Sequence, residues 1–258
     1  MSESKKVAVA GATGRVGRHV VDVLTERGHE VVPISRTHGV DVITGAGLAD
    51  ALAGVESLVD TATGPSPEQQ AATEFFTTAT ANLQAAGTRA GVLRIIVVSI
   101  INTDRLQGGY AIAKVAHERA MLAGPIPARV LRAAQFHEFV EQLVQWGTQG
   151  DVAHVPAMRT QLVAARTVAE ALADLAVDPA AAPGPTLEIA GPRPENLVEM
   201  ARLVVARRGN GLRVEEVSDP VDGAANESGV LLPGRGATLG GPTFEEWLDS
   251  PSFKGAAE

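Results

Sequence analysis

A short apolar run that passes directly into GATGRVG limits what this chain can fold into more than any other feature of its sequence. Lys6–Ala10 (KVAVA) is typical of a buried strand, and the amphipathic residues that follow predict a helix over Gly14–Glu26. A strand, a glycine turn and a helix in this order bring backbone amides and a helix N-terminus to one point, where the helix dipole favours a phosphate group. The turn at Gly11–Gly17 therefore predicts the phosphate-binding end of a parallel α/β sheet.

The rest of the chain continues the alternation of strands and helices that builds such a sheet. Further strands are predicted at His29–Ser35, Val40–Ile43, Ser57–Ala62, Arg94–Ile100, Ala128–Arg132, Gln161–Ala164 and Thr186–Ile189. Further helices are predicted at Leu48–Ala53, Pro67–Ala90, Tyr110–Leu122, Phe136–Trp146, Thr167–Val177 and Glu195–Arg208, and irregular structure at Asp219–Gly241. We expect an α/β Rossmann fold with a doubly wound parallel sheet, in which residues 1–258 form one domain and residues from about 147 onward contribute a small C-terminal substrate lobe.

The composition excludes several classes of protein. The chain has no cysteine, which excludes disulfides and thiolate catalysis, and its six histidines show no metal-ligand spacing, so no metal site is expected. A net charge of −8 without any basic run argues against nucleic-acid binding. The polar start is unlike a secretory signal, and no apolar run approaches a membrane span. We therefore expect a cytoplasmic protein without a nucleic-acid or membrane partner.

The end of the second predicted strand indicates which nucleotide is bound. A site for NAD usually places an acidic residue there, on the ribose 2′-hydroxyl. This chain places Ser35 and Arg36 there instead, and Arg15 lies within the glycine turn. A hydroxyl and guanidinium groups suit a 2′-phosphate, so NADP(H) is predicted in preference to NAD(H). The alternative is that Arg36 is a solvated surface charge.

The only tyrosine of the chain, Tyr110, lies four residues before Lys114 and eleven after Ser99. A spacing of four places Tyr110 and Lys114 on one face of a helix, one turn apart. A free phenol titrates near ~10, and a neighbouring ammonium favours the phenolate, so such a pair is suited to proton transfer. The alternative is an exposed helix start whose lysine stem covers apolar surface.

These motifs together resemble the short-chain dehydrogenase/reductase superfamily, and within it the atypical, NmrA-like branch of NAD(P)H-binding proteins. GATGRVG is similar to the fingerprint of the extended and atypical members. GVDV, with Asp41 and Val42, resembles a short acidic motif that contacts adenine, and VDTATG (residues 59–64) resembles the strand that passes under the cofactor. TANLQAAGTRAGVLRIIVVS (80–99) and LRAAQFHEF (131–139) resemble the family's long helix with its next strand and a recurring stretch of bacterial oxidoreductases.

The resemblance implies a role for each residue that matches a family motif. Tyr110 and Lys114 match the family's Tyr-x-x-x-Lys, and Ser99 falls at the family serine. Tyr110 is then the proton donor to the substrate oxygen, Ser99 hydrogen-bonds the substrate carbonyl, and Lys114 binds the nicotinamide ribose. The predicted cofactor-binding residues are Gly11, Thr13, Gly14, Arg15, Val16, Gly17, Ser35, Arg36, Asp41, Val42, Thr61, Ala62, Thr63 and Lys114.

Gln135, Phe136, His137 and Phe139 are the predicted substrate-binding residues, because they follow Ala128–Arg132 at the carboxyl end of that strand. Both phenylalanines equally suit a core, and His137 suits an alternative proton donor, a helix cap or a surface group. The stretch Ala133–Phe136 lacks the proline-glycine turn common in catalytic relatives. Asn82 matches the family's structural Thr-x-Asn and is not predicted to be catalytic.

The predicted function is an NAD(P)H-dependent oxidoreductase, an enzyme that uses NADPH to reduce a small carbonyl or quinone-like molecule. A second hypothesis is a non-catalytic NmrA-like regulator that binds NADP as a redox sensor. A third is an isomerase or epimerase that uses the cofactor transiently, although the C-terminal lobe is short for a nucleotide-sugar site. The partner is a small-molecule substrate, and the family analogy allows a monomer or a homodimer.

Overall fold

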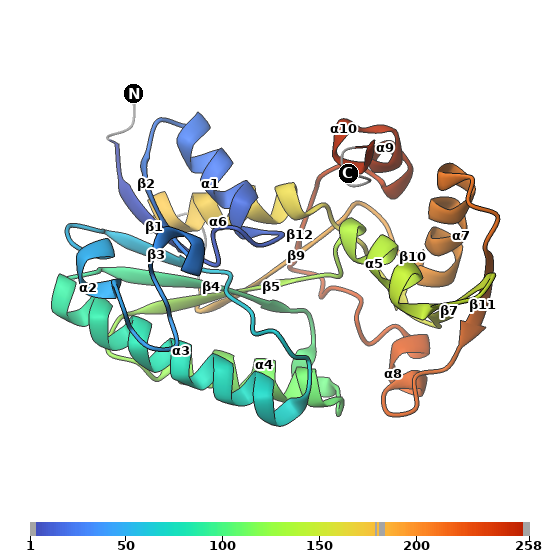
Figure 1. The fold of residues 1–258 in the computed structure, drawn as a ribbon, viewed down its shortest axis with the longest axis horizontal. Coiled ribbons are helices and arrows are strands. Elements are labelled where there is room, and N and C mark those ends of the chain that lie inside the picture. The colour runs from blue at the N-terminus through green and yellow to red at the C-terminus, as the bar shows by residue number, and fades with distance from the viewer. Residues whose placement is uncertain (1–3, 179, 181–183, 255–258) are drawn as a thin grey trace. The chain divides into compact units, whose positions relative to one another are not determined.

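A seven-stranded parallel sheet is the central element of the computed structural model, which describes residues 4–178, 180 and 184–254 (Figure 1). Its strands are β1 (Lys6–Ala10), β2 (Glu30–Ile34), β3 (Ser57–Asp60), β4 (Arg94–Ile100), β5 (Ala128–Ala133), β9 (Thr186–Ala190) and β12 (Thr238–Leu239). They lie in the order β12-β9-β5-β4-β3-β1-β2, with Val7 of β1 opposite Val31 of β2 and Ser57 of β3. The chain leaves β1 toward β2 on one side and continues through β3 on the other, so the predicted doubly wound Rossmann-type sheet is confirmed.

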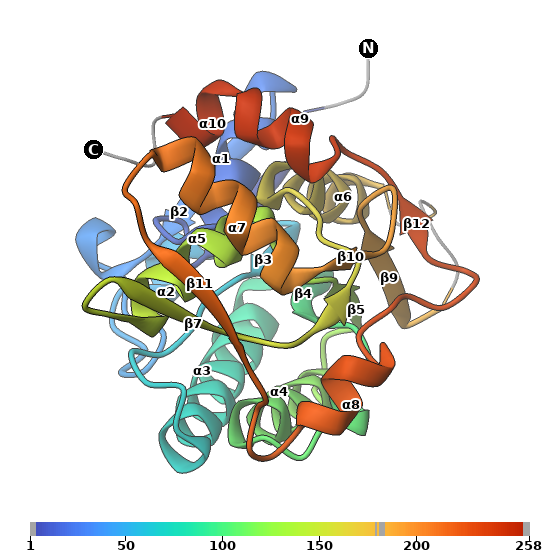
Figure 2. The same ribbon diagram turned by 90° about the vertical axis from the view of Figure 1, so that its right-hand side faces the viewer.

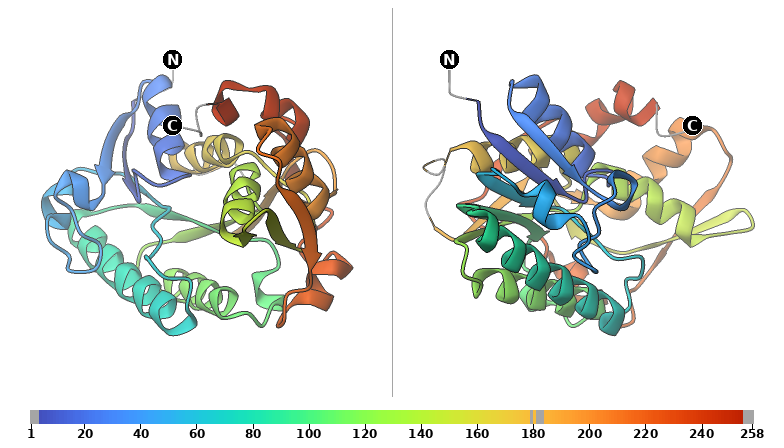
Figure 3. Two further views of the ribbon diagram at one scale, coloured as in Figure 1. Left: turned by 45° about the vertical axis from the view of Figure 1, so that its right-hand side comes forward. Right: turned by 60° about the vertical axis from the view of Figure 1, so that its left-hand side comes forward.

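The chain divides into two compact units, and the first carries the glycine turn. It comprises Met1–Ser99, Gly108–Arg132 and Val168–Leu187. Its helices are α1 (Gly17–Glu26), α2 (Leu48–Ala51), α3 (Gln69–Ala90), α4 (Gly109–Leu122) and most of α6 (Ala165–Val177). Helices α3 and α4 pack side by side on one face of the sheet, and α1 and α6 cover the other (Figures 1 and 3). Leu58, Leu83, Ile95 and Met121 are fully buried in the core between the sheet and α3 and α4.

The second unit comprises Ile100–Gln107, Ala133–Thr167 and Glu188–Glu258. Its helices are α5 (His137–Gly147), α7 (Leu197–Arg208), α8 (Gly223–Ser228), α9 (Phe244–Asp249) and α10 (Pro251–Lys254). Its small sheets pair β11 (Arg213–Val217) with β7 (Val152–Pro156) and β6 (Thr148–Gln149), and β10 (Glu195–Asn196) with β8 (Arg159–Thr160). Figure 2 shows α7 beside β11, and the core of this unit includes the buried aromatic residues Phe244 and Trp247.

The second unit starts earlier in the sequence than the lobe expected from residue 147, because it takes in Ile100–Gln107 and the residues from Ala133. The side chain of Asn102, which has a positive φ of 52°, donates to the carbonyl of Val230 at 2.7 Å and of Leu232 at 3.1 Å. These bonds attach the short segment after β4 to residues far along the chain. The single-domain organisation stays a prediction.

The strand predicted at Val40–Ile43 is absent, and this prediction is wrong for a local reason. The Asp41 carboxylate accepts the amides of Ile43 at 2.7 Å and Thr44 at 3.3 Å, which folds these residues into a turn. The Asn82 amide then donates to the carbonyls of Val42 at 2.9 Å and Ile43 at 2.8 Å. Both sets of bonds take backbone groups that a strand would need, and they give Asn82 the structural role expected for it.

Two predictions for the second half of the chain also need correction. Gln161–Ala164 forms no strand, since only Val163 pairs there, in a single bridge to Phe136, and the neighbouring strand is β8. Asp219–Gly241 is not wholly irregular, because it contains α8 and β12. The predicted helices and the other predicted strands are present with their ends shifted by a few residues, as at α1, which begins at Gly17 and not at Gly14. No helix of the described residues is long and apolar enough to cross a membrane.

Candidate functional site

The glycine turn is held against the end of β3 by close backbone contacts. Gly11 has φ +76°, and its carbonyl accepts the amide of Gly14 at 2.9 Å. A Cβ placed on Gly17 would lie 2.1 Å from the Gly11 oxygen and 2.7 Å from Thr61 Oγ1. Thr61 Oγ1 in turn donates to the carbonyl of Ala10 at 2.7 Å. Glycine is therefore required at Gly11 for its backbone conformation and at Gly17 for close packing.

The turn has the properties of a phosphate cradle. Thr13 and Gly14 are exposed, Arg15 is half-buried, and Val16 is buried beneath them. None of the described side chains caps the N-terminus of α1. The dipole of this ten-residue helix favours negative charge at its N-terminus. These residues fit the diphosphate of a dinucleotide.

The end of β2 presents a group of polar side chains in a single turn of 3-10 helix, Arg36–His38. Ser35 Oγ lies 2.8 Å from Thr37 Oγ1 and 2.7 Å from His38 Nδ1, while the Arg36 side chain is exposed. The amides of Gly11 and Ala12 donate to the carbonyl of Ile34, which brings the end of β2 to the glycine turn. Ser35 and Arg36 are thus next to the turn as a 2′-phosphate site requires, and their role stays a prediction.

The other predicted cofactor residues lie at the same edge of the first unit. Thr61 and Ala62 are half-buried and directly follow β3, and Thr63 is exposed. Asp41 and Val42 lie in the turn that Asn82 holds. Their contact with adenine stays a prediction. Thr63 Oγ1 lies 3.2 Å from Tyr110 Oη. This contact brings α4 to the residues that follow β3.

One face of α4 carries three polar side chains at a helical spacing: Tyr110, Lys114 and His117. All three contact the ring of Phe76 on α3. The Phe76 and Tyr110 ring centroids are 6.0 Å apart, the His117 ring stacks on Phe76 at 4.5 Å, and Lys114 Nζ lies 4.6 Å from the Phe76 centroid. The Phe76 ring therefore packs against all three groups.

Lys114 is buried, so the alternative of an exposed lysine at a helix start is wrong. Its exposed fraction is 5%, and Nζ donates to the carbonyl of Val98 at 2.8 Å and lies 3.0 Å from His117 Nδ1. Burial lowers the pKa of the ammonium to about 8, and the charges of Asp60 and Glu118 oppose that change. The ammonium therefore remains largely charged at neutral pH.

His117 connects Lys114 to Asp60. Its Nε2 lies 3.1 Å from Asp60 Oδ2, and both side chains are almost fully buried. Burial, followed by the charge of Lys114, lowers the pKa of His117, while its hydrogen bond to Asp60 acts in the opposite direction. The imidazole is therefore neutral at neutral pH. Since an ammonium only donates, Nδ1 accepts from Lys114 and Nε2–H donates to the Asp60 carboxylate.

Ser99 is 3% exposed and lies within β4, one residue before its end. Its Oγ is buried and has no hydrogen-bond partner among the described residues. A buried hydroxyl without a hydrogen-bond partner is unusual in a folded protein. The serine belongs to the same unit as Tyr110 and Lys114, and its role toward a substrate stays a prediction.

The predicted substrate residues belong to the second unit. Gln135 Oε1 accepts from Thr160 Oγ1, and the ring of Phe139 meets Trp146 edge-on at 6.3 Å. Phe136 is half-buried at the start of α5. Burial lowers the pKa of His137 to about 4, so this fully buried imidazole is neutral and packs against Phe244 and Trp247. His137 thus has a clear packing role, and substrate binding by these four residues is untested.

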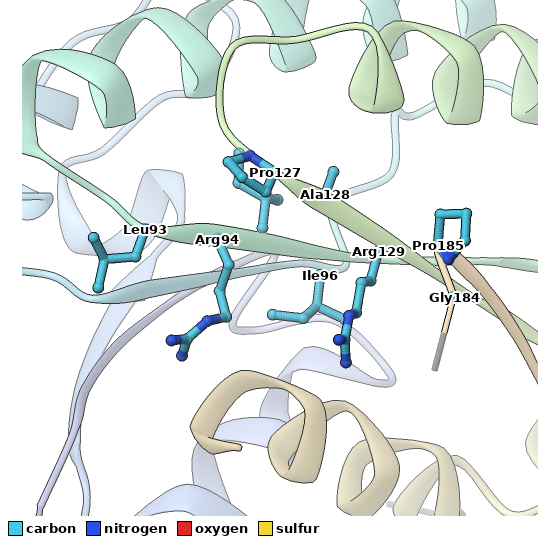
Figure 4. A pocket seen from close by; sticks show the side chains of 9 residues that line it. Leu93, Arg94, Ile96, Pro127, Ala128, Arg129, Gly184 and Pro185 are labelled. Atoms are coloured by element: carbon cyan, nitrogen blue, oxygen red, sulfur yellow. The ribbon is translucent and has the colours of Figure 1, made fainter. Parts of the chain in front are cut away.

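Two clefts lie away from the predicted residues. One, of about 370 Å³, opens at the amino ends of β4 and β5, where Arg94 and Arg129 point the same way (Figure 4). Arg94 already donates to Ser57 Oγ and the Ala176 carbonyl, and ligands of such sheets bind at the opposite strand ends. The other cleft, of about 540 Å³, lies in the second unit and is lined in part by Glu195. Burial raises the pKa of Glu195 to about 7. No group of three or more His, Asp or Glu within the described part of the chain is placed to hold a metal ion.

Sequence reasoning missed Asp60, His117 and Phe76. The signal for His117 was its position three residues after Lys114, which places both on one helix face. Asp60 closes the buried strand β3, where a carboxylate needs a partner, but the partner's identity depends on how α4 packs. Phe76 had no distinguishing signal among the apolar residues of α3.

We predict that Gly17→Ala destabilises the protein. The added methyl group meets backbone oxygen at the Gly11 carbonyl, so the turn must move, at a cost of about 1–3 kcal/mol in the free energy of unfolding. Urea unfolding measures this loss. Gly236→Ala is the matched control, because no atom lies within 4 Å of its Cβ position, and we expect a change within about 0.5 kcal/mol. Equal stability of both variants would contradict the packing described for Gly17.

Solved structures share the fold, several of them with NAD bound, although no protein-family model and no curated protein matches the sequence. A short-chain dehydrogenase/reductase superfamily protein from Agrobacterium tumefaciens with bound NAD is 18% identical (TM-score 0.67; 98% of this chain and 97% of that chain). A UDP-N-acetylglucosamine 4-epimerase from Bacillus cereus is also 18% identical (TM-score 0.70; 97% and 96%). An NAD-dependent NDP-hexosamine 5,6-dehydratase involved in tunicamycin biosynthesis is 15% identical (TM-score 0.72; 99% and 99%). These structures confirm the fold expected from the superfamily resemblance, and they do not single out its NmrA-like branch.

Proposed function

We propose that this protein is an NADPH-dependent oxidoreductase that reduces a small carbonyl or quinone-like molecule. The observation that carries the proposal is the position of Tyr110 on α4. Its Oη lies 3.2 Å from Thr63 Oγ1, two residues beyond the threonine that packs against the glycine turn. A phenol suited to proton transfer and a phosphate cradle are thus linked through residues 61–63 within one unit.

The residues of the first unit fit a dinucleotide. The start of α1 suits its diphosphate, and Ser35 and Arg36 suit a 2′-phosphate. Lys114 Nζ has two of its three donors directed to Val98 and His117, which leaves one N–H for a ribose hydroxyl. Several solved structures with this fold contain NAD, and NADP(H) is proposed for this protein because of Arg36.

The bound nicotinamide supplies hydride to the substrate carbon. In the proposed reaction Tyr110 donates its phenolic proton to the substrate oxygen, so the O–H bond of the phenol breaks as the new O–H bond forms. The Lys114 ammonium stabilises the negative charge that develops on the phenol oxygen. Ser99 Oγ–H donates to the same substrate oxygen and orients the carbonyl.

We expect Tyr110→Phe to remove the proton donor and keep the ring that meets Phe76. The turnover of NADPH with carbonyls and quinones should fall by about 10²–10⁴-fold, with unchanged NADPH affinity. Spectrophotometric assays and calorimetric titration measure the two quantities. Full activity of the variant would assign the proton donor elsewhere. A wild-type protein that binds NADPH and never consumes it would disprove the oxidoreductase and favour the redox sensor.

Arg36→Ala tests the choice of cofactor. A lost charge-assisted hydrogen bond costs about 1.5–3 kcal/mol, so the dissociation constant of NADPH should rise about tenfold or more while that of NADH changes little. Arg89→Ala, on the exposed surface of α3, is the matched control and should leave both constants unchanged. Equal losses for NADPH and NADH would remove the case for a 2′-phosphate.

The isomerase or epimerase considered in the sequence analysis is the other catalytic candidate. The epimerase and the dehydratase described above share the fold over nearly their whole length, so the expectation that the C-terminal lobe is short for a nucleotide sugar does not count against this candidate. An isomerase returns the hydride to its product and shows no net loss of NADPH. Stoichiometric oxidation of NADPH by the carbonyl or quinone substrate distinguishes the oxidoreductase from it.

A further inference from the structure

Beneath the proposed site, Asp60, His117 and Lys114 form a continuous chain of buried polar groups. Asp60 Oδ2 lies 3.1 Å from His117 Nε2, and His117 Nδ1 lies 3.0 Å from Lys114 Nζ. The three residues are 1%, 1% and 5% exposed, respectively. A carboxylate and an ammonium buried to this extent are costly unless they are paired, and the imidazole is the group that joins them.

We propose that Asp60 and His117 are positioning residues, which keep the buried Lys114 ammonium charged and oriented one helical turn from Tyr110. The catalytic consequence rests on the proposed function, because it concerns proton transfer by Tyr110. The effect of Asp60 and His117 on the charge of Lys114 is a property of the protein alone and is measurable without any cofactor.

The charges that face Lys114 make Asp60 its main counterion. On α4 itself, Glu118 contributes a second carboxylate, but Arg132 of β5 binds it with two hydrogen bonds of 3.0 Å and 2.7 Å. From α3 the ammonium meets the Phe76 ring, and from β4 the Val98 carbonyl. Tyr110 and His117 are the remaining titratable groups on its helix face. Asp60 is therefore the nearby carboxylate whose described side-chain partner is a neutral imidazole and not a guanidinium.

Each hydrogen bond of the chain has one consistent direction. Lys114 donates to Nδ1, which fixes the remaining imidazole proton on Nε2, and Nε2–H donates to Asp60. Hydrogen bonding to the charged forms of Lys114 and Asp60 favours those forms. The stacked Phe76 ring, 4.5 Å from the imidazole, holds the ring plane in this orientation. The imidazole thus orients the ammonium and passes on the influence of Asp60 without carrying a charge.

The sign of the resulting pH dependence follows from the depressed pKa of Lys114. In the folded protein this pKa is about 8, and the ordinary value is 10.5. Between these values the unfolded chain binds more protons, so this lysine makes the free energy of unfolding rise with pH across that window. Removing the charge of Asp60 lowers the pKa of Lys114 in the folded protein further. The free energy of unfolding must therefore begin to rise at a lower pH.

The test compares the free energy of unfolding of four proteins: wild type, Asp60→Asn, Lys114→Met and the double variant. Urea unfolding is followed from about pH 6 to about pH 10. Subtracting each Lys114→Met curve isolates the contribution of the lysine. We expect that contribution to begin rising near pH 8 with Asp60 present, and about one pH unit or more lower with Asp60→Asn. An unchanged onset would overturn the proposal.

Glu74→Gln is the control for a general loss of negative charge, because Glu74 is exposed on the helix that carries Phe76. In this variant the contribution of Lys114 should begin to rise at the same pH as in the wild type. A shift as large as that of Asp60→Asn would also overturn the proposal. If Asp60→Asn does not fold, His117→Gln and His117→Leu replace it. Glutamine retains an acceptor for Lys114 and a donor for Asp60, so its onset should lie above that of leucine. If this contribution begins to rise at the same pH in both variants, His117 does not connect Asp60 to Lys114.

Activity measurements with cofactor and substrate give a second, separate test. The alkaline limb of kcat against pH should move to lower pH in Asp60→Asn, because the ammonium that favours the phenolate of Tyr110 is lost earlier. A purely structural role of Asp60 lowers stability and leaves this limb in place. If the wild type shows no turnover but the unfolding curves shift, the proposed function fails and the inference about Lys114 stands. If the wild type turns over but Asp60→Asn shifts neither the unfolding curves nor the alkaline limb of kcat, the proposed function stands and the inference about Lys114 is rejected.

Discussion

The close approach of Gly17 to the Gly11 carbonyl and to Thr61 is the contact on which the rest of the site depends. It leaves no room for a Cβ, and it joins the turn after β1 to the residues after β3. From there Thr61 bonds back to β1, and Thr63 reaches Tyr110 on α4. These contacts hold the start of α1 against the carboxyl ends of β1 and β3. These are the strand ends at which ligands bind in open α/β sheets.

The polar groups of α4 add a second constraint, which is electrostatic. Burying an ammonium beneath a site is unfavourable, and the molecule offsets this cost with Asp60, Glu118, the Val98 carbonyl and the Phe76 ring. Burial still lowers the pKa of Lys114 to about 8, because the opposing charges of Asp60 and Glu118 only partly offset it. A lysine in the solvated environment of a helix start would stay charged over the whole accessible pH range and would respond little to its neighbours.

The sequence was sufficient for the sheet, its helices and the glycine turn, because periodicity and turn chemistry are local properties. The false strand at Val40–Ile43 shows the limit of that reasoning. Its β-branched residues fit a strand, yet the Asp41 carboxylate and the Asn82 amide take the backbone groups of this segment. Similarly, Tyr110 and Lys114 were identified by their spacing, whereas Asp60 and Phe76 join them only through the packing of α4 on β3 and α3. Contacts between distant segments require the fold and are not visible in the sequence.

A structure of the protein with NADP bound would test the central claim most directly. The diphosphate should lie at the start of α1, a ribose hydroxyl should accept from Lys114 Nζ, and the nicotinamide should leave room for a substrate carbonyl in hydrogen-bond reach of Tyr110 Oη, about 2.6–3.2 Å. A cofactor bound away from the glycine turn, or a nicotinamide ring that Tyr110 and a substrate cannot approach together, would contradict it.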